Sequence, residues 1–312
     1  MSLLFYTHPV ALLHEAGLGH PESPLRLKAI LKALQESEPP GLVRREAPVA
    51  SLGQIQRVHP ERYTTRILAS VPREGFVRVD ADTVLNPHSG EAALRAAGAA
   101  CAAVDAVMAG ESKAAFCAMR PPGHHAESME AMGFCVFNTV AVAALQARVA
   151  HKLSRLAIFD FDVHHGNGTQ AIFYDDPDTL YISTHQAPLY PGTGLLQERG
   201  IKGNILNRPL PPGTGGAAWR RVVERDVLPT IDGWRPQMIF ISAGFDAHAD
   251  DPLASMALVE EDFAWVTREL LLLADRHCDS RIVSVLEGGY DPPALARSVM
   301  AHLQELSRET RR

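Results

Sequence analysis

The chain has 312 residues, a formal net charge of −6, 46% hydrophobic residues and 21% charged residues. This composition is typical of a globular protein and excludes a mostly disordered chain. The slightly acidic balance offers no basic surface for phosphates, so we expect no direct binding to nucleic acid. No apolar run reaches the roughly 18 residues that a membrane span requires, so we expect no membrane insertion either.

Apolar runs typical of buried strands alternate along the chain with amphipathic stretches typical of helices. The predicted strands cover residues 3–6, 76–79, 114–119, 155–165, 179–184, 204–210, 238–242 and 281–286. The predicted helices cover residues 25–34, a stretch after Pro60, 89–110, a stretch from about Asn138, one opened by 211–213, 260–275 and 293–306. Such alternation predicts a mainly parallel sheet with helices on both faces. We therefore expect a single α/β domain over residues 1–312.

Four cysteines are spread along the chain, and no two of them form a Cys-x-x-Cys pair. They are Cys101, Cys117, Cys135 and Cys278. The sequence also opens without the basic and apolar segments of a secretory signal. Both features favour a reducing compartment, so we expect a cytoplasmic protein.

The stretch from residue 155 to 169 carries the most informative pattern. An apolar run leads into alternating Asp160, Asp162 and His164, and glycines at 166 and 168 then end the strand. Side chains two apart in a strand point the same way, so the spacing predicts that these three groups converge. The alternative is that the aspartates cap the following helix. Two carboxylates within an apolar strand favour a metal site instead, because a buried carboxylate is costly unless a cation or hydrogen bonds compensate it.

Three further segments with chemically active side chains and nearby glycines also follow predicted strands. They contain His124 and His125, Asp246, and Tyr290. The carboxyl ends of parallel strands share one edge of a sheet, so these segments are expected to meet there. Each has an ordinary alternative when taken alone: a loop pair of histidines, a helix cap and a packed aromatic ring. Four such segments at the same kind of position favour a functional site.

Together these motifs resemble the zinc-dependent histone deacetylase family, and most of all its bacterial class II-like members. The resemblance runs from residue 20 to 290 and rests on the segments 120–125 (Arg-Pro-Pro-Gly-His-His), 133–135, 160–168, 190–194, 242–246 and 287–290. It implies the arginase/deacetylase fold, with a mainly parallel sheet of about eight strands. It also implies a Zn²⁺ cofactor and, as in other members, K⁺.

The resemblance assigns zinc to Asp162, His164 and Asp246, a set that matches the three-ligand pattern of catalytic zinc sites. His125 is then the general base, and His124 is its electrostatic partner, oriented by Asp160. Tyr290 donates its hydroxyl to the developing oxyanion. Asn167 stands where class I members carry an aspartate, and this change removes a charge that would raise the pKa of His125.

The same resemblance places Phe134 and Tyr190 on the walls of a narrow acyl-lysine tunnel, next to Gly133. Asp82 matches a rim aspartate that holds the substrate backbone, although Asp80 is close enough to be the alternative. Leu253 occupies the position where polyamine-specialised members carry a gatekeeper glutamate. The predicted potassium site uses Asp160, Ser183 and Thr184, with backbone oxygens of residues 162 and 164. His165, His185 and His248 are interpreted as neighbours of the site that do not bind the metal.

The leading hypothesis is an amidohydrolase that removes acyl groups from lysine side chains of a protein or peptide. Deacetylation of acetylpolyamines or other small acylated amines is the alternative, and the missing glutamate at Leu253 counts against it. A non-catalytic acyl-lysine binder is a third hypothesis, which would require the loss of His125, Tyr290 or a metal ligand. None of these is lost. An oligomer is possible on this sequence.

Overall fold

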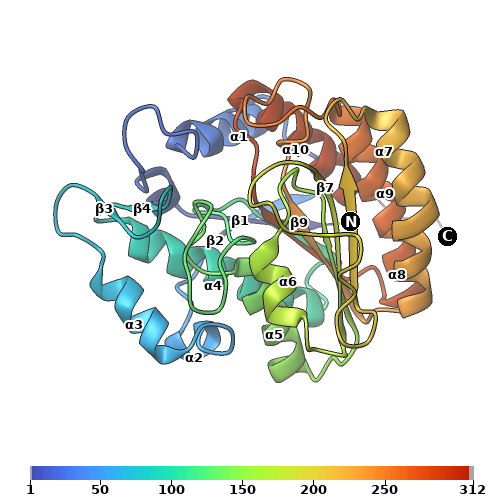
Figure 1. Cartoon of the computed structure of the whole chain (residues 1–312), viewed down its shortest axis with the longest axis horizontal. Coiled ribbons are helices and arrows are strands. Elements are labelled where there is room, and N and C mark those ends of the chain that lie inside the picture. Colours follow the sequence, from blue (N-terminus) through green and yellow to red (C-terminus); the bar gives the residue numbers. More distant parts are fainter. Residues whose placement is uncertain (1, 309–312) are drawn as a thin grey trace.

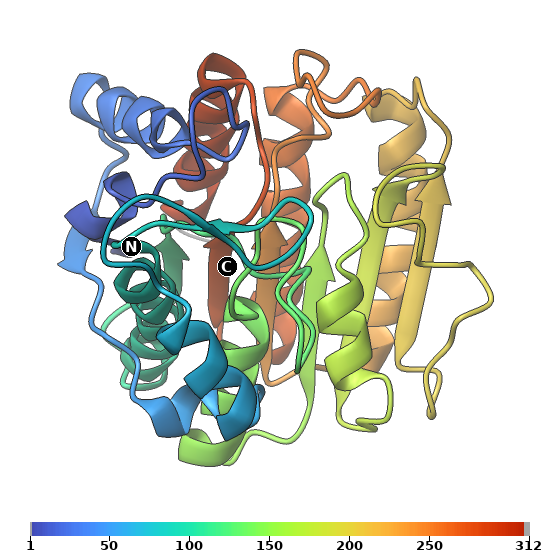
Figure 2. The same cartoon turned by 60° about the vertical axis from the view of Figure 1, so that its left-hand side comes forward.

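A computed structural model describes residues 2–308 and contains one eight-stranded sheet in which every pairing of neighbouring strands is parallel. The strand order is β2-β1-β5-β10-β9-β6-β7-β8. The strands are β1 (Leu3–Thr7), β2 (Leu42–Glu46), β5 (Ala114–Cys117), β6 (Leu156–Asp160), β7 (Thr179–Gln186), β8 (Ile205–Leu210), β9 (Met238–Ala243) and β10 (Ile282–Leu286). The strand arrowheads that are visible in Figure 2 point the same way. The expected mainly parallel sheet of about eight strands is confirmed.

Helices cover both faces of this sheet, as predicted (Figure 1). One layer contains α1 (Pro24–Glu36), α7 (Gly216–Val222), α8 (Leu228–Trp234), α9 (Glu260–His277) and α10 (Pro292–Leu306). The other contains α2 (Leu52–Ile55), α3 (Glu61–Ala69), α4 (Ser89–Met108), α5 (Thr139–His151) and α6 (Asn167–Phe173). None of the helices within residues 2–308 combines the length and the apolarity needed to cross a membrane.

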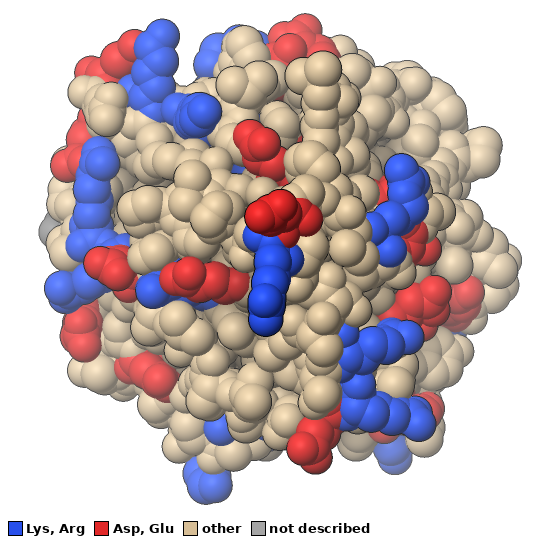
Figure 3. Space-filling view, turned by 90° about the vertical axis from the view of Figure 1, so that its left-hand side faces the viewer, with Lys and Arg blue, Asp and Glu red and all other residues tan. Residues whose placement is uncertain are grey.

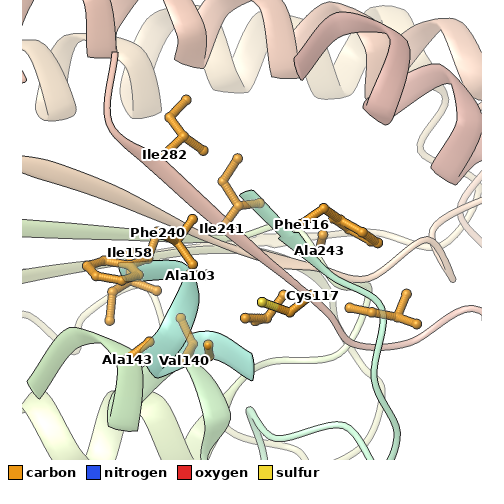
Figure 4. Packing of buried hydrophobic residues seen from close by; sticks show 14 of the residues in the cluster. Ala103, Phe116, Cys117, Val140, Ala143, Ile158, Phe240, Ile241, Ala243 and Ile282 are labelled. Atoms are coloured by element: carbon orange, nitrogen blue, oxygen red, sulfur yellow. The ribbon is translucent and has the colours of Figure 1, made fainter. Parts of the chain in front are cut away.

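The core lies between the sheet and these two layers. The four central strands β5, β10, β9 and β6 are buried along their whole length, which explains why they are read as continuous apolar runs. Figure 4 shows Ile158 of β6 and Phe240 of β9 close to Ala103 of α4 and to Val140 and Ala143 of α5. Small alanines on the helices let the layer approach the larger strand side chains closely.

Three predicted details are corrected by the structure. The strand expected over 155–165 ends at Asp160, and the following residues up to Gly166 are irregular, so a strand pleat does not align Asp162 and His164. The edge strand β2 was missed because its sequence Leu-Val-Arg-Arg-Glu is polar and mostly exposed. The helix predicted to open at 211–213 begins at Gly216 and continues through a π-helical turn, Val223–Val227, into α8.

Prediction also placed a strand at 76–79, and the structure confirms a shorter one. It is β3 (Val77–Arg78), which pairs antiparallel with β4 (Val84–Leu85) in a separate two-stranded sheet. This β3–β4 hairpin lies beside the loop that leads to α1 (Figures 1 and 2).

A buried ion network ties α1 to the loops at the carboxyl ends of the central strands. Glu22 accepts hydrogen bonds from Arg120 (2.6 Å from Nη2 to Oε2) and from Arg26 (3.0 Å), and His14 Nε2 lies 3.4 Å away. Arg26 also donates to the backbone oxygens of Gly289 (2.6 Å) and Glu287. Burial raises the pKa of Glu22, but Arg120 and His14 outweigh it and hold the pKa well below its ordinary value.

Removing this single carboxylate charge leaves two buried guanidinium groups without their counter-ion. We expect Glu22→Gln to lower the free energy of unfolding by about 3–5 kcal/mol, because removing one partner of a buried ion pair leaves the other charge buried without compensation. Urea unfolding at pH 7 measures the loss. The matched control is Glu38→Gln, which breaks the half-exposed 2.8 Å pair with Arg44 and should cost no more than about 1 kcal/mol. An equal loss of unfolding free energy in the two variants would contradict a stabilising role for the buried ion network.

Candidate active site and metal centre

The four predicted functional segments lie at the carboxyl ends of four adjacent strands. β5 leads to His124 and His125, β10 leads to Tyr290, β9 leads to Asp246, and β6 leads to Asp162. Because β5, β10, β9 and β6 are neighbours in this order, segments far apart in sequence share one edge of the sheet.

Asp162, His164 and Asp246 converge there into one buried group whose possible ligand atoms all lie within 4.8 Å of one another. His164 Nδ1 is 3.1 Å from Asp162 Oδ1 and 3.1 Å from Asp246 Oδ2. Burial lowers the pKa of His164, but the two carboxylates outweigh it and raise the pKa to about 10. A protonated His164 balances only one of two buried negative charges, so the group favours a cation.

Main-chain hydrogen bonds give this irregular segment its shape. Asp162 Oδ1 accepts from the backbone N–H of His164 (2.9 Å), and Asp162 Oδ2 accepts from that of Gly288 (2.8 Å). Asp246 Oδ1 accepts from the backbone N–H of Val163 (2.8 Å), which leaves Oδ2 facing His164. A Cβ at Gly288 would lie 1.9 Å from Asp246 Oδ2, so only glycine fits beside the carboxylate. Two carboxylates and one imidazole, oriented in this way, fit a three-ligand zinc site.

The adjacent histidines His124 and His125 have opposite electrostatic environments. His124 Nδ1 lies 3.0 Å from Asp160 Oδ2, and that carboxylate also accepts from the Tyr181 hydroxyl (3.1 Å). Burial lowers the pKa of His124, but Asp162 and Asp160 outweigh it and raise the pKa well above its ordinary value. The pKa of His125 lies well below its ordinary value, because the ring is buried and stands between His124 and His164. His125 is therefore neutral near pH 7.

The side chain of Asn167 fixes which nitrogen of His125 carries the proton. Its Nδ2 donates to Glu127 Oε1 (3.0 Å), which directs its Oδ1 to His125 Nδ1 at 2.9 Å. An amide oxygen only accepts, so Nδ1 carries the hydrogen and Nε2 is left as a free acceptor.

A narrow pocket of about 250 Å³ leads to this group from the surface. It is lined by Asp82, His125, Gly133, Phe134, His164, Leu189, Tyr190, Leu253 and Tyr290. All five predicted substrate-binding residues line this pocket, and Leu189 is an addition. Gly133 has φ +56°, and a Cβ there would lie 2.4 Å from the His125 ring. The Tyr290 ring stands edge-on to Phe134 (5.8 Å between centres), and its hydroxyl has no hydrogen-bond partner among residues 2–308.

Of the two candidate rim aspartates, Asp82 lines the pocket. Its Oδ1 accepts from the backbone N–H of Gly133 (3.1 Å) and from the Thr83 hydroxyl (3.1 Å). Burial, with a smaller effect from Asp80, raises the pKa of Asp82.

Other predicted residues do not line the pocket. Thr184 Oγ1 accepts from Trp219 Nε1 (3.1 Å), and Ser183 Oγ lies 2.9 Å from His185 Nδ1. His165 turns away from the metal group, with Nδ1 2.7 Å from Thr193 Oγ1. His248 packs beside Glu260 (3.5 Å). These contacts do not test the potassium site expected around Asp160, Ser183 and Thr184, which therefore stays a prediction.

Sequence reasoning missed two carboxylates that hold the pocket loops in place. Glu287 Oε2 accepts from the backbone N–H groups of Gly123 (2.7 Å) and His124 (3.1 Å). Asp251 accepts from the backbone N–H of Tyr290 (2.7 Å) and of Leu253 (2.9 Å). For Glu287 a signal existed, because it directly follows the buried strand β10 and is followed by two glycines. Asp251 is in a loop, and only the fold brings it to Tyr290.

Comparison with known proteins agrees with this geometry. The histone deacetylase domain family matches residues 20–306. A probable deacetylase of Archaeoglobus fulgidus is 42% identical over 91% of this chain and 80% of its own length. A histone deacetylase-like amidohydrolase of Pseudomonas aeruginosa is also 42% identical, over 94% of this chain and 78% of its own length. The crystal structure of the HDA15 HD domain superposes with a TM-score of 0.92 at 33% identity, and it covers 99% of this chain and 90% of that chain.

The chain therefore belongs to the histone deacetylase family, whose fold it shares. The names of these two relatives, a probable deacetylase and a histone deacetylase-like amidohydrolase, support an enzyme of this class.

Removal of one ligand charge tests the metal centre directly. We expect the wild-type protein to bind one equivalent of Zn²⁺, and Asp246→Asn to weaken this binding at least about tenfold, because the neutral amide no longer balances the dication. Calorimetric titration of the chelator-treated protein measures both affinities. Asp175→Asn, which changes an exposed aspartate at the end of α6, is the matched control and should bind as the wild type does. Unchanged affinity in Asp246→Asn would show that this carboxylate is not a ligand.

Proposed function

We propose that this protein is a zinc-dependent amidohydrolase that removes acetyl or other acyl groups from the Nε atom of lysine in peptides or proteins. One observation supports the proposal above all. At the end of a single narrow pocket, the candidate metal ligands meet a neutral imidazole and a tyrosine hydroxyl that has no hydrogen-bond partner within the described residues 2–308. These are the groups that hydrolysis of an unactivated amide needs.

Asp162, His164 and Asp246 would hold the metal. Zinc held there would supply Lewis acidity toward the amide carbonyl and toward a water molecule. The potassium ion stays part of the proposal, with Asp160, Ser183 and Thr184 as its neighbours.

His125 acts as general base in this proposal. Its unprotonated Nε2 accepts a proton from the attacking water, and it then returns a proton to the leaving amine. The bond from Nδ1–H to Asn167 fixes the tautomer needed for this role. His124, held by Asp160 and with a raised pKa, adds positive charge beside the His125 ring, whose centre is 4.0 Å away.

Tyr290 donates its hydroxyl to the carbonyl oxygen as negative charge develops on it. Asp251 and Arg26 support the position of this ring. Asp251 binds the Tyr290 backbone N–H at 2.7 Å, and the Arg26 guanidinium lies 4.8 Å from the ring centre.

The pocket suits an acyl-lysine side chain better than a polyamine. Phe134 and Tyr190 provide apolar walls for a methylene stem, which offers nothing to hydrogen-bond. Leu253, at the pocket mouth, carries no charge to attract a second ammonium group of a polyamine. All four cysteines are free and buried, which is compatible with the cytoplasmic location that we propose.

A substrate panel tests the function. The zinc-loaded protein is assayed on acetyl-lysine peptides, longer acyl-lysine peptides, acetylspermidine and acetylputrescine. We expect turnover of acyl-lysine peptides, its loss on chelation and its return with zinc. A preference for the acetylpolyamines would favour the small-amine alternative. Stoichiometric binding of acetyl-lysine peptides without hydrolysis would favour the non-catalytic binder.

Removal of the Tyr290 hydroxyl distinguishes a catalytic deacetylase from a non-catalytic acyl-lysine binder. Tyr290→Phe keeps the ring and removes one donor that matters most as charge develops, so we expect kcat to fall about 10²–10³-fold with KM changed little. Steady-state kinetics on one acetyl-lysine peptide measure the effect, and metal content is checked in the same sample. Tyr174→Phe, at a partly exposed tyrosine after α6, is the control and should keep wild-type kinetics. Turnover of Tyr290→Phe within about threefold of wild type would make this tyrosine a packing residue.

A further inference from the structure

A second hollow lies beside the mouth of the narrow pocket. It has a volume of about 530 Å³ and is formed by the loop of residues 15–20, the start of α1 and Phe76, which precedes β3. We call this hollow the side groove. Its apolar lining includes Leu18, Leu25 and Phe76.

The large apolar side chains of the side groove are exposed. Leu18 is fully exposed, while Leu25 and Phe76 are 59% and 54% exposed. Large apolar side chains gathered in a hollow mark a binding surface more often than scattered ones do. Figure 3 views the face that carries α1 and the β3–β4 hairpin, where scattered acidic and basic side chains leave most of the surface uncharged. The side groove itself is lined by one acidic and one basic residue, Glu15 and Lys28, beside its apolar side chains.

A single imidazole separates the side groove from the pocket. His20 lines the side groove, and its ring lies 4.8 Å from the ring of Phe134 in the pocket wall. His20 Nε2 is also 3.2 Å from the backbone oxygen of Asp82, another pocket residue. An extended polypeptide advances about 3.3 Å per residue. A chain whose lysine enters the pocket thus reaches across His20 within one or two residues.

We propose that the side groove binds an apolar side chain of a polypeptide substrate, one or two residues away from the acyl-lysine. This inference rests on the proposed function and narrows its substrate class to polypeptides. A small acylated amine offers no apolar side chain to the side groove: acetylputrescine ends at its ammonium group, and the part of acetylspermidine beyond the four-methylene stem carries charged amines. Leucine or phenylalanine next to the lysine would be favoured over serine or glycine, because only the former bury apolar surface against Leu18 and Phe76.

The surface that continues from the side groove along α1 also fits a polypeptide substrate. Leu25 and Lys28 line both the side groove and a larger hollow of about 760 Å³ between α1 and α10. The two hollows together lead away from the pocket mouth along α1, so there is room for several residues of an extended chain.

The test compares acetyl-lysine peptides that differ only in their neighbours. One series places leucine in turn at the two positions on each side of acetyl-lysine in an otherwise serine and glycine sequence. With the zinc-loaded wild type, we expect one position to raise kcat/KM about tenfold over the all-polar peptide, mainly through KM. The double variant Leu18→Ser/Phe76→Ser should reduce this ratio to about twofold or less. Each value is divided by that for acetyl-lysine amide measured with the same variant, so that a general loss of activity cancels.

Leu272→Ser is the matched control. It changes a half-exposed leucine of α9 outside the side groove and should keep the full tenfold ratio. Thermal unfolding and sedimentation of all variants check the fold and the oligomeric state.

The possible failures are distinct. No hydrolysis of any substrate by the wild type would overturn the proposed function. Hydrolysis of all peptides at equal efficiency would overturn only the proposal that the side groove binds a substrate side chain. A leucine preference that survives in the double variant would do the same. A shift from oligomer to monomer in the double variant, without a change in preference, would assign this face to contacts between copies of the chain.

Discussion

Buried carboxylates at one edge of the sheet are the constraint on which the site depends. Asp160, Asp162, Asp246 and Glu287 are all fully buried, and a buried carboxylate is unfavourable unless hydrogen bonds or a cation compensate it. Each of the four accepts at least one backbone N–H from the loops after the central strands. The loops therefore take the conformations that supply these donors. The irregular backbone after β6 follows from the charges that it surrounds.

The same principle gives two adjacent histidines different roles. His124 and His125 are both buried, and burial alone lowers the pKa of each. The neighbouring charges then make the difference: the carboxylates of Asp162 and Asp160 act on His124, whereas the imidazoles of His124 and His164 act on His125. The carboxylates favour the imidazolium at His124, and the two neighbouring histidines favour the neutral ring at His125. A charged and a neutral imidazole thus stand with ring centres 4.0 Å apart without any change of residue type.

Most of the fold could be predicted from the sequence because the buried strands are continuous apolar runs bounded by glycine, proline or charged residues. Strand β2 was not predicted because an exposed edge strand has no such apolar run. The structure brings together the three residues that the sequence proposed as metal ligands, but the geometric reason given for this was wrong. The strand ends at Asp160, and hydrogen bonds, not a pleat, orient Asp162 and His164. The partners of Glu287 and Asp251, and the side groove, depend on how distant loops approach one another. Local sequence pattern carries no information on that approach.

The buried ion network has a consequence for how this architecture is inherited. Residues 2–41, the described part of the chain before β2, contribute no residue to the candidate metal group, yet Arg26 binds the backbone oxygens of residues 287 and 289, next to Tyr290. Some 260 residues separate these partners along the chain. Recombination that exchanged one end of the chain between diverged relatives would pair an arginine with a loop that had not been selected beside it. The two ends of the chain thus form one unit of inheritance, although the chemistry is concentrated at the middle of the sheet.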